Sequence, residues 1–178
     1  MSTFTLVAPE TATGQAKELL TAVKAKMGVV PNMTRAMAQA PAVLDAYLQL
    51  SGALAKGALK PKTREQIALT VGQANQCGYC LAAHSTIGKM VGLAPEQILA
   101  ARRGRADDAA TDALLRFAAV VVEKRGLVEP ADLAAVRSAG FGDDAIAEIV
   151  GNVALNLFTN YFNHVAGTAL DFPAAPAL

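Results

Sequence analysis

The chain has 178 residues, of which 53% are hydrophobic and only 5% aromatic, and its 16 basic and 15 acidic side chains give a net charge of +1. Because the basic residues form no stripe, a nucleic-acid partner is not expected, and no apolar run reaches the roughly 18 residues of a transmembrane span. The first residues lack the charged and apolar regions of a signal peptide, so we expect a cytoplasmic location.

Helical periodicity runs along nearly the whole chain, interrupted by glycine and proline, which mark helix ends and first turns. The predicted helices cover about 13–27, 32–39, 41–57, 61–76, 79–91, 95–104, 107–125, 130–140 and 143–170. Asn32 is placed to cap the second helix, and residues 174–178 are expected to be loosely ordered. No useful strand pattern occurs, so we predict one all-α domain, a helical bundle spanning residues 1–178.

The last predicted helix is apolar on most of its circumference, as Ile149, Val153, Leu157 and Val165 illustrate. A helix of this kind belongs at a domain centre or in an oligomer interface. Charged residues make up 17% of the chain, which is low for a soluble monomer. Both features favour a homo-oligomer in which helix faces are covered by another subunit.

Three of the four cysteine and histidine residues lie within one short segment, at Cys77, Cys80 and His84. If Cys77 sits at the start of a helix, Cys80 and His84 project from the same side, three and seven positions later. A helix N-terminus and a nearby imidazolium both favour the reactive thiolate. Cysteines three apart can also close a disulfide, so the spacing suits a reversible dithiol–disulfide couple in which His84 moves the proton.

A zinc site is the main alternative for these residues. A structural zinc ion needs four ligands, whereas the other histidine, His164, has asparagine neighbours and no cysteine partner. We therefore expect no metal. Covalent haem attachment is excluded because it requires histidine directly after the second cysteine, where Leu81 stands.

Glu65 can join the dithiol only if the chain bends. In one straight helix, twelve positions would turn Glu65 about 120° away from Cys77, so the helix must break near Cys77 and Gly78. The alternative is a solvated carboxylate in the first turn after Pro61, paired with Arg64. The residues alone favour this alternative.

The spacing of Glu65, Cys77, Cys80 and His84 resembles the alkylhydroperoxidase D-like branch of the carboxymuconolactone decarboxylase superfamily, in its peroxidase-related members. The resemblance covers nearly the whole chain. Its further motifs are Gly28-Val29-Val30-Pro31-Asn32-Met33, Leu59 with Arg64-Glu65, Asn160-Tyr161-Phe162-Asn163-His164 and Asp171-Phe172-Pro173.

The resemblance implies an all-helical homo-oligomer, a trimer or hexamer, with peroxiredoxin-like antioxidant activity. Cys80 would attack a hydroperoxide, Cys77 would resolve the sulfenic acid, and His84 would carry the proton with Glu65 as its partner, directly or through water. No bound cofactor is implied; a lipoyl- or thioredoxin-type dithiol would supply electrons. Tyr79 departs from the family, whose best-known peroxidases have histidine there, and tyrosine is a poor base near neutrality.

Two other functions stay open from the sequence. One is a lyase of the decarboxylase type that uses His84 and Glu65 as acid and base, although that branch generally lacks the cysteine pair. The other is a non-enzymatic redox-sensing or metal-binding oligomer.

Asn156, Asn160, Asn163 and His164 form a polar stripe on the last helix. We interpret the stripe as a buried hydrogen-bond network that fixes helix register or subunit contacts, rather than as placing His164 at the edge of the active site.

Overall fold

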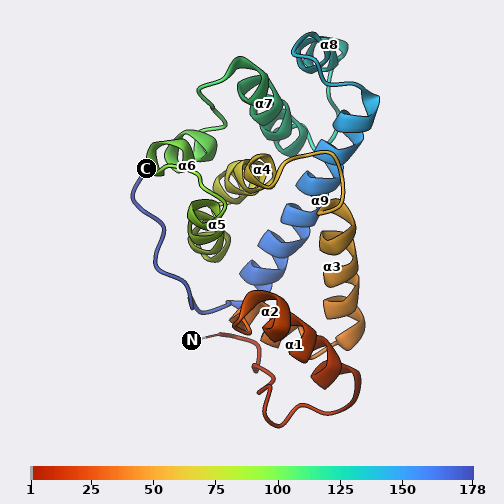
Figure 1. Cartoon of the computed structure of the whole chain (residues 1–178), viewed down its shortest axis with the longest axis vertical. Coiled ribbons are helices and arrows are strands. Elements are labelled where there is room, and N and C mark those ends of the chain that lie inside the picture. Colours follow the sequence, from red (N-terminus) through yellow and green to blue (C-terminus); the bar gives the residue numbers. More distant parts are fainter. Residues whose placement is uncertain (1) are drawn as a thin grey trace.

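The computed structural model describes residues 2–178, and within them the chain is all-helical, with no strand (Figure 1). The helices are α1 (Gly14–Met27), α2 (Asn32–Met37), α3 (Pro41–Leu54), α4 (Pro61–Ala74), α5 (Gly78–Met90), α6 (Pro95–Arg102), α7 (Ala109–Glu123), α8 (Pro130–Ser138) and α9 (Asp143–Ala166). The predicted fold class and order of helices are confirmed. None of these described helices is both long and apolar enough to cross a bilayer.

Proline and glycine fix most of the helix boundaries. Helices α3, α4, α6 and α8 each begin with a proline in the first turn, where its missing N–H costs nothing. Helix α9 ends four residues earlier than predicted, because Gly167 adopts a left-handed conformation with φ of 53° and closes the helix.

Helix α4 lies at the centre of the fold, packed against α5, α6, α7 and α9. Figure 1 shows the long α9 running past α4, with α3 along its other side and α1 and α2 at one end of the molecule. The main apolar core is built around these central helices and includes Ile67, Leu69, Leu114 and Ile149, none of which is exposed. The last helix was predicted to lie at the domain centre or in an oligomer interface; one side of α9 does pack into the central core through Ile149 and Val153, and the interface stays a prediction.

A second apolar cluster joins α1, α2 and α3 through residues such as Leu20, Met37 and Leu44. A third, smaller cluster contains Cys77, Tyr79 and Cys80. Because Met33 packs against both the second and the third cluster, the N-terminal helices form a wall beside the cysteines. The fold therefore encloses the dithiol between its central helices and its N-terminal part.

Two local predictions are wrong. Pro31, not Asn32, holds the position before α2, and the Asn32 side chain instead donates from Nδ2 to the Ala169 carbonyl at 3.2 Å. The C-terminal residues are docked rather than loose, since Ala175 packs on the main core and Arg102 donates to the Pro176 carbonyl. A sequence pattern could not reveal these contacts, because their partners are distant in the chain.

Candidate active site

The break between α4 and α5 shapes the site. Gln76 adopts a left-handed conformation with φ of 54°, which reverses the chain, and the Cys77 N–H donates to the Gly72 carbonyl at 2.9 Å. Cys77 then caps α5, because its Sγ accepts a hydrogen bond from the Cys80 N–H at 3.4 Å. The predicted break and the predicted place of Cys77 at the helix start are both confirmed.

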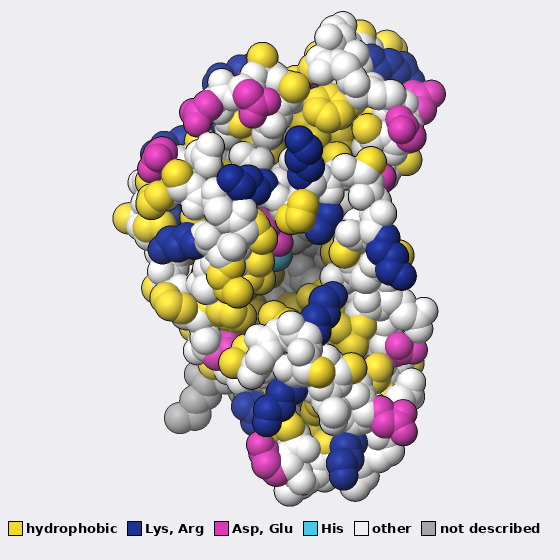
Figure 2. Space-filling model, in the orientation of Figure 1, with side chains coloured by type: hydrophobic (Ala, Val, Ile, Leu, Met, Phe, Trp, Pro, Cys, Tyr) yellow, Lys and Arg dark blue, Asp and Glu magenta, His cyan; other side chains and the backbone are white. Residues whose placement is uncertain are grey.

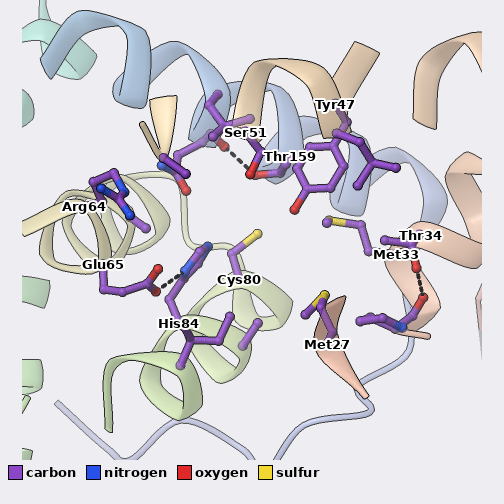
Figure 3. A pocket seen from close by; sticks show the side chains of 18 of the residues that line it. Met27, Met33, Thr34, Tyr47, Ser51, Arg64, Glu65, Cys80, His84 and Thr159 are labelled. Carbon is purple, nitrogen blue, oxygen red and sulfur yellow. Dashed lines mark hydrogen bonds and ion pairs between the residues drawn. The ribbon is translucent and has the colours of Figure 1, made fainter. Parts of the chain in front are cut away.

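Glu65 on α4 and His84 on α5 form a direct pair. The Oε2 atom of Glu65 lies 2.7 Å from Nδ1 of His84 (Figure 3), so the alternative pairing of Glu65 with Arg64 is wrong. Burial alone would lower the pKa of His84, but the Glu65 carboxylate outweighs it and raises the pKa above its ordinary value. The paired histidine is therefore held in its protonated form to higher pH than a free one.

Cys80 is held by an amide from α9. Asn163 donates from Nδ2 to Cys80 Sγ at 3.3 Å and lies 3.2 Å from Met33 Sδ. Its neighbour Asn160 accepts from Asn75 Nδ2 at 3.0 Å, which ties α9 to the turn before the dithiol. The polar stripe of α9 thus connects helices as predicted, through Asn160, and Asn163 also contacts the Cys80 sulfur. His164, in contrast, is exposed and does not line the cavity.

The two buried thiols ionise as one unit. Both cysteines are free thiols with at most 2% of their surface exposed. Hydrogen bonding from Cys80 lowers the pKa of Cys77 to about 6, whereas its bond to Cys77 and its burial raise the pKa of Cys80. The pKa values of the two thiols are therefore shifted in opposite directions, and Cys77 is the more acidic of the pair.

Tyr79 serves packing rather than proton transfer. Its hydroxyl accepts a hydrogen bond from the Met33 N–H at 3.2 Å, and its ring meets Phe172 edge-on at 5.9 Å between centroids. Burial raises the pKa of Tyr79 above its ordinary value, so the phenol stays neutral. Tyr79 therefore anchors α2 and the C-terminal segment over the dithiol.

Cys80, His84 and Glu65 open onto one cavity of about 430 Å³. Figure 2 shows the cavity as a hollow in the face of the molecule, with a histidine and an acidic side chain visible inside it. Most of the wall is apolar, and it comes from α1, α2, α3, α4, α5 and α9 together with Phe172. The polar side chains on the wall are Lys26, Thr34, Tyr47, Ser51, Arg64, Glu65, Tyr79, Cys80, His84, Asn152, Asn156 and Thr159. Cys77 is absent from the lining and lies behind Cys80.

Several of these cavity residues could not be assigned from the sequence. Tyr47 on α3 directs its hydroxyl toward Cys80 (Figure 3), and burial, with Cys80 and Glu65 nearby, raises the pKa of Tyr47 to about 12. Its hydroxyl can therefore donate a hydrogen bond into the cavity throughout the neutral range. In the sequence Tyr47 is simply one apolar position of an amphipathic helix, and no local signal distinguishes it.

The described residues contain no group of three or more histidine, cysteine, aspartate or glutamate side chains placed to share a metal ion. In particular His84 is engaged by Glu65, and His164 is on the exposed side of α9. The donor set therefore does not match the four-ligand requirement of a structural zinc ion.

The carboxymuconolactone decarboxylase family matches residues 41–123, a span that contains Glu65, both cysteines and His84. Residues 41–123 therefore match the carboxymuconolactone decarboxylase family over nearly half of the chain. A comparison with curated proteins finds no significant match.

Solved structures are similar to this protein over nearly its whole chain. An uncharacterised peroxidase-related protein from Ralstonia eutropha JMP134, described as an alkylhydroperoxidase AhpD core, is 26% identical over 96% of this chain and 92% of its own, with a TM-score of 0.86. A peroxidase-related protein from Silicibacter sp. TM1040 is 27% identical over 87% and 84% of the two chains, with a TM-score of 0.79.

The debrominase Bmp8, solved with 2,3,4-tribromopyrrole, is 20% identical over 96% and 94% of the two chains, with a TM-score of 0.79. At that identity the likeness concerns the fold alone. The fold of this chain is thus AhpD-like, as the sequence resemblance implied.

Proposed function

We propose that this protein is a thiol-dependent hydroperoxidase with an antioxidant role, in which the Cys77–Cys80 dithiol reduces an organic hydroperoxide. The observation that carries the proposal is the placement of the Cys80 thiol and the Glu65–His84 pair on the wall of one cavity. A nucleophilic sulfur and a proton donor that face the same enclosed space are the two groups that peroxide cleavage needs. The peroxidase-related neighbours at 26% and 27% identity agree with it.

Cys80 is the attacking residue in this proposal because it lines the cavity, whereas Cys77 does not. Ionisation of Cys77, whose pKa is lowered to about 6, leaves a negative charge on the pair, and transfer of the Cys80 proton to Cys77 puts that charge on the attacking sulfur. The Asn163 amide, 3.3 Å from Cys80 Sγ, stabilises the thiolate there.

In the first step the Cys80 thiolate attacks the terminal oxygen of the hydroperoxide. An S–O bond forms, the O–O bond breaks, and the departing alkoxide takes a proton from the His84 imidazolium to leave as an alcohol. Cys80 is then a sulfenic acid, and the substrate has been reduced by two electrons. Glu65 holds the imidazolium in place through Nδ1.

In the second step Cys77 resolves the sulfenic acid. The Cys77 sulfur attacks Cys80 Sγ, the Cys77 proton and the hydroxyl leave as water, and a disulfide forms. An external dithiol of the lipoyl or thioredoxin type then reduces the disulfide, becomes a disulfide itself and returns the proton to His84. The cycle requires no bound cofactor.

Cysteine variants test this sequence of steps. With a dithiol reductant, we expect Cys80→Ser and Cys77→Ser both to lose catalytic turnover of cumene hydroperoxide. In a single turnover without reductant, Cys77→Ser should still consume about one equivalent and carry a sulfenic acid that dimedone traps, whereas Cys80→Ser should consume none. Turnover by the serine variants at the wild-type rate would overturn the proposal.

A lyase reaction is the second candidate, because the Glu65–His84 pair could act as acid and base without the thiols and the family is named for a decarboxylase. Full activity on a carboxylated lactone after alkylation of both cysteines would favour it. Elemental analysis of the purified protein addresses the third possibility, a metal-binding oligomer, since a stoichiometric metal would displace the peroxidase proposal.

A further inference from the structure

The cavity wall carries two basic side chains that have no role in the proposed peroxide reaction. These are Lys26 and Arg64, and Glu65 is the only carboxylate on the wall. Because Glu65 is engaged by His84 at 2.7 Å, its charge is balanced within the pair. In Figure 2 basic side chains border the hollow on more than one side. An anionic group that enters the cavity would therefore meet a net attractive field.

Arg64 is the better placed of the two cations. It follows Pro61 in the first turn of α4, and its Nη1 donates to the Leu59 carbonyl, which fixes the direction of the side chain. Among the described residues no carboxylate lies within ion-pair distance of its guanidinium. The planar guanidinium therefore keeps donors free for a partner, and a carboxylate fits this geometry best.

The two ends of the cavity differ in character. Figure 3 shows Arg64 and Glu65 at one end, Met27 and Thr34 toward the other, and Cys80 between them. The far end is formed mainly by apolar side chains of α1 and α2. At about 430 Å³ the space also falls in the range of about 300–1,000 Å³ typical of sites for drug-sized molecules, far more than hydrogen peroxide needs.

We infer that the substrate is an amphipathic organic hydroperoxide that carries a carboxylate, with this carboxylate bound by Arg64 and its apolar body against α1 and α2. Lys26 is exposed on α1 beside Met27, away from the Arg64 end, and is not part of the proposed carboxylate site. This inference rests on the proposed hydroperoxidase function, since it names the substrate class of the same site. Arg64 is a binding residue that selects the substrate and takes no part in the proton or electron transfers.

A matched pair of hydroperoxides tests the inference. Cumene hydroperoxide and its 4-carboxy derivative differ only in the carboxylate. We expect the wild type to have a kcat/KM about tenfold higher for the carboxylated compound, which corresponds to one charged hydrogen-bonded contact. Arg64→Gln should bring the ratio of the two kcat/KM values to about one, mostly through a higher KM for the carboxylated compound, and Arg64→Lys should restore part of the preference. Arg103→Gln, an exposed arginine outside the cavity, is the control and should match the wild type.

The inference would be overturned if Arg64→Gln lowered kcat/KM equally for both hydroperoxides, or if the wild type had the same kcat/KM for the two. Binding of the unreactive 4-isopropylbenzoate, measured by calorimetry against the neutral 4-isopropylbenzamide, separates it from the proposed function. If neither hydroperoxide is turned over but Arg64→Gln weakens binding of the benzoate and not of the amide, the anion site stands and the peroxidase proposal fails. If the wild type binds the benzoate no better than the amide, the anion site is refuted.

Discussion

At the scale of single residues, the Glu65–His84 pair gives the site its dependence on pH. Because Glu65 raises the pKa of His84 in the folded protein, the pair stabilises the fold fully below the unfolded pKa of about 6.5, and this contribution is lost as the pH rises through the folded pKa. We expect Glu65→Gln to lower the free energy of unfolding by about 1 kcal/mol at pH 6, a modest value because the pair is partly exposed to solvent. Near pH 9 the loss should be smaller.

Urea unfolding at the two pH values measures this change, and NMR titration of the histidine C2 proton measures its cause. The chain has only two histidines, so a His164→Gln background leaves one resonance to follow. In Glu65→Gln we expect that resonance to titrate at lower pH than in the parent. The same midpoint in both proteins would show that the carboxylate does not control the imidazole.

The sequence predicts the residues to which the proposed function assigns the chemistry, but it does not predict how the residues around them are arranged. Cys77, Cys80 and His84 are found from spacing because they lie on one turn and one helix, where periodicity fixes which side chains share a face. Glu65 is found only through the family resemblance. Tyr47 is not distinguished by the sequence, and Arg64 and Asn163 are named there without their places at the cavity and at the Cys80 sulfur. The three residues come from three different helices, and a local pattern contains no information on which helix faces meet.

At the scale of elements, the turn between α4 and α5 depends on a residue in an unfavourable conformation. Gln76 has φ of 54°, a region that costs a residue with a side chain roughly 1–2 kcal/mol. We expect Gln76→Gly to raise the free energy of unfolding by about 0.5–1 kcal/mol, since the extra entropy of unfolded glycine offsets part of the gain. Gln76→Val, which is β-branched, should lower it by at least about 1 kcal/mol.

Arg125 provides the matched control, because it has the same φ of 54° in the turn after α7, outside the cavity lining. Valine at either position should destabilise the fold to a similar extent in urea. Only Gln76→Val should also slow reaction of the thiols with iodoacetamide or peroxide, because that turn sets the Cys77 cap. Equal loss of thiol reactivity in both valine variants would mean that the effect is general destabilisation.

Helix positions could be predicted because glycine and proline mark them in the sequence. The break at Cys77 and Gly78 was predictable on the same ground, but its geometry was not, since the residue that reverses the chain is glutamine rather than glycine. The capping role expected of Asn32 failed for a related reason. Its amide binds the Ala169 carbonyl, a contact 137 positions away in the chain that no local rule can anticipate.

At the scale of the whole molecule, the C-terminal segment completes the enclosure of the dithiol. Phe172 packs against the cluster of Cys77, Tyr79 and Cys80, and the Asp171 carboxylate accepts a hydrogen bond from the Asn32 N–H at 2.5 Å. The segment thus joins α2 to α5 on the side of the cysteines. Because Cys77 is only 1% exposed, the external dithiol of the proposed cycle would have to reach a Cys77–Cys80 disulfide through the cavity or after movement of this segment.

Helix α9 presents an apolar stripe to solvent. Val150, Phe158, Tyr161 and Val165 are 44%, 38%, 56% and 69% exposed, and their spacing places them within about 80° of arc on the helix. From residue 149 to residue 170 the sequence contains no aspartate, glutamate, lysine or arginine. Continuous apolar surface without charge is typical of a protein–protein interface, and the homo-oligomer predicted from composition would cover it with a second copy of the same chain.

We therefore expect the protein to form a trimer or hexamer at micromolar concentration, and the double variant Tyr161→Glu/Val165→Glu to be monomeric, because four or more carboxylates would be buried without partners in a closed assembly. Light scattering coupled to gel filtration gives the mass directly. Leu127→Glu, at a residue 83% exposed in the loop between α7 and α8, is the control and should leave the assembly intact. A monomeric wild type would refute the oligomer, and an unchanged mass in the double variant would place the interface on another face of the molecule.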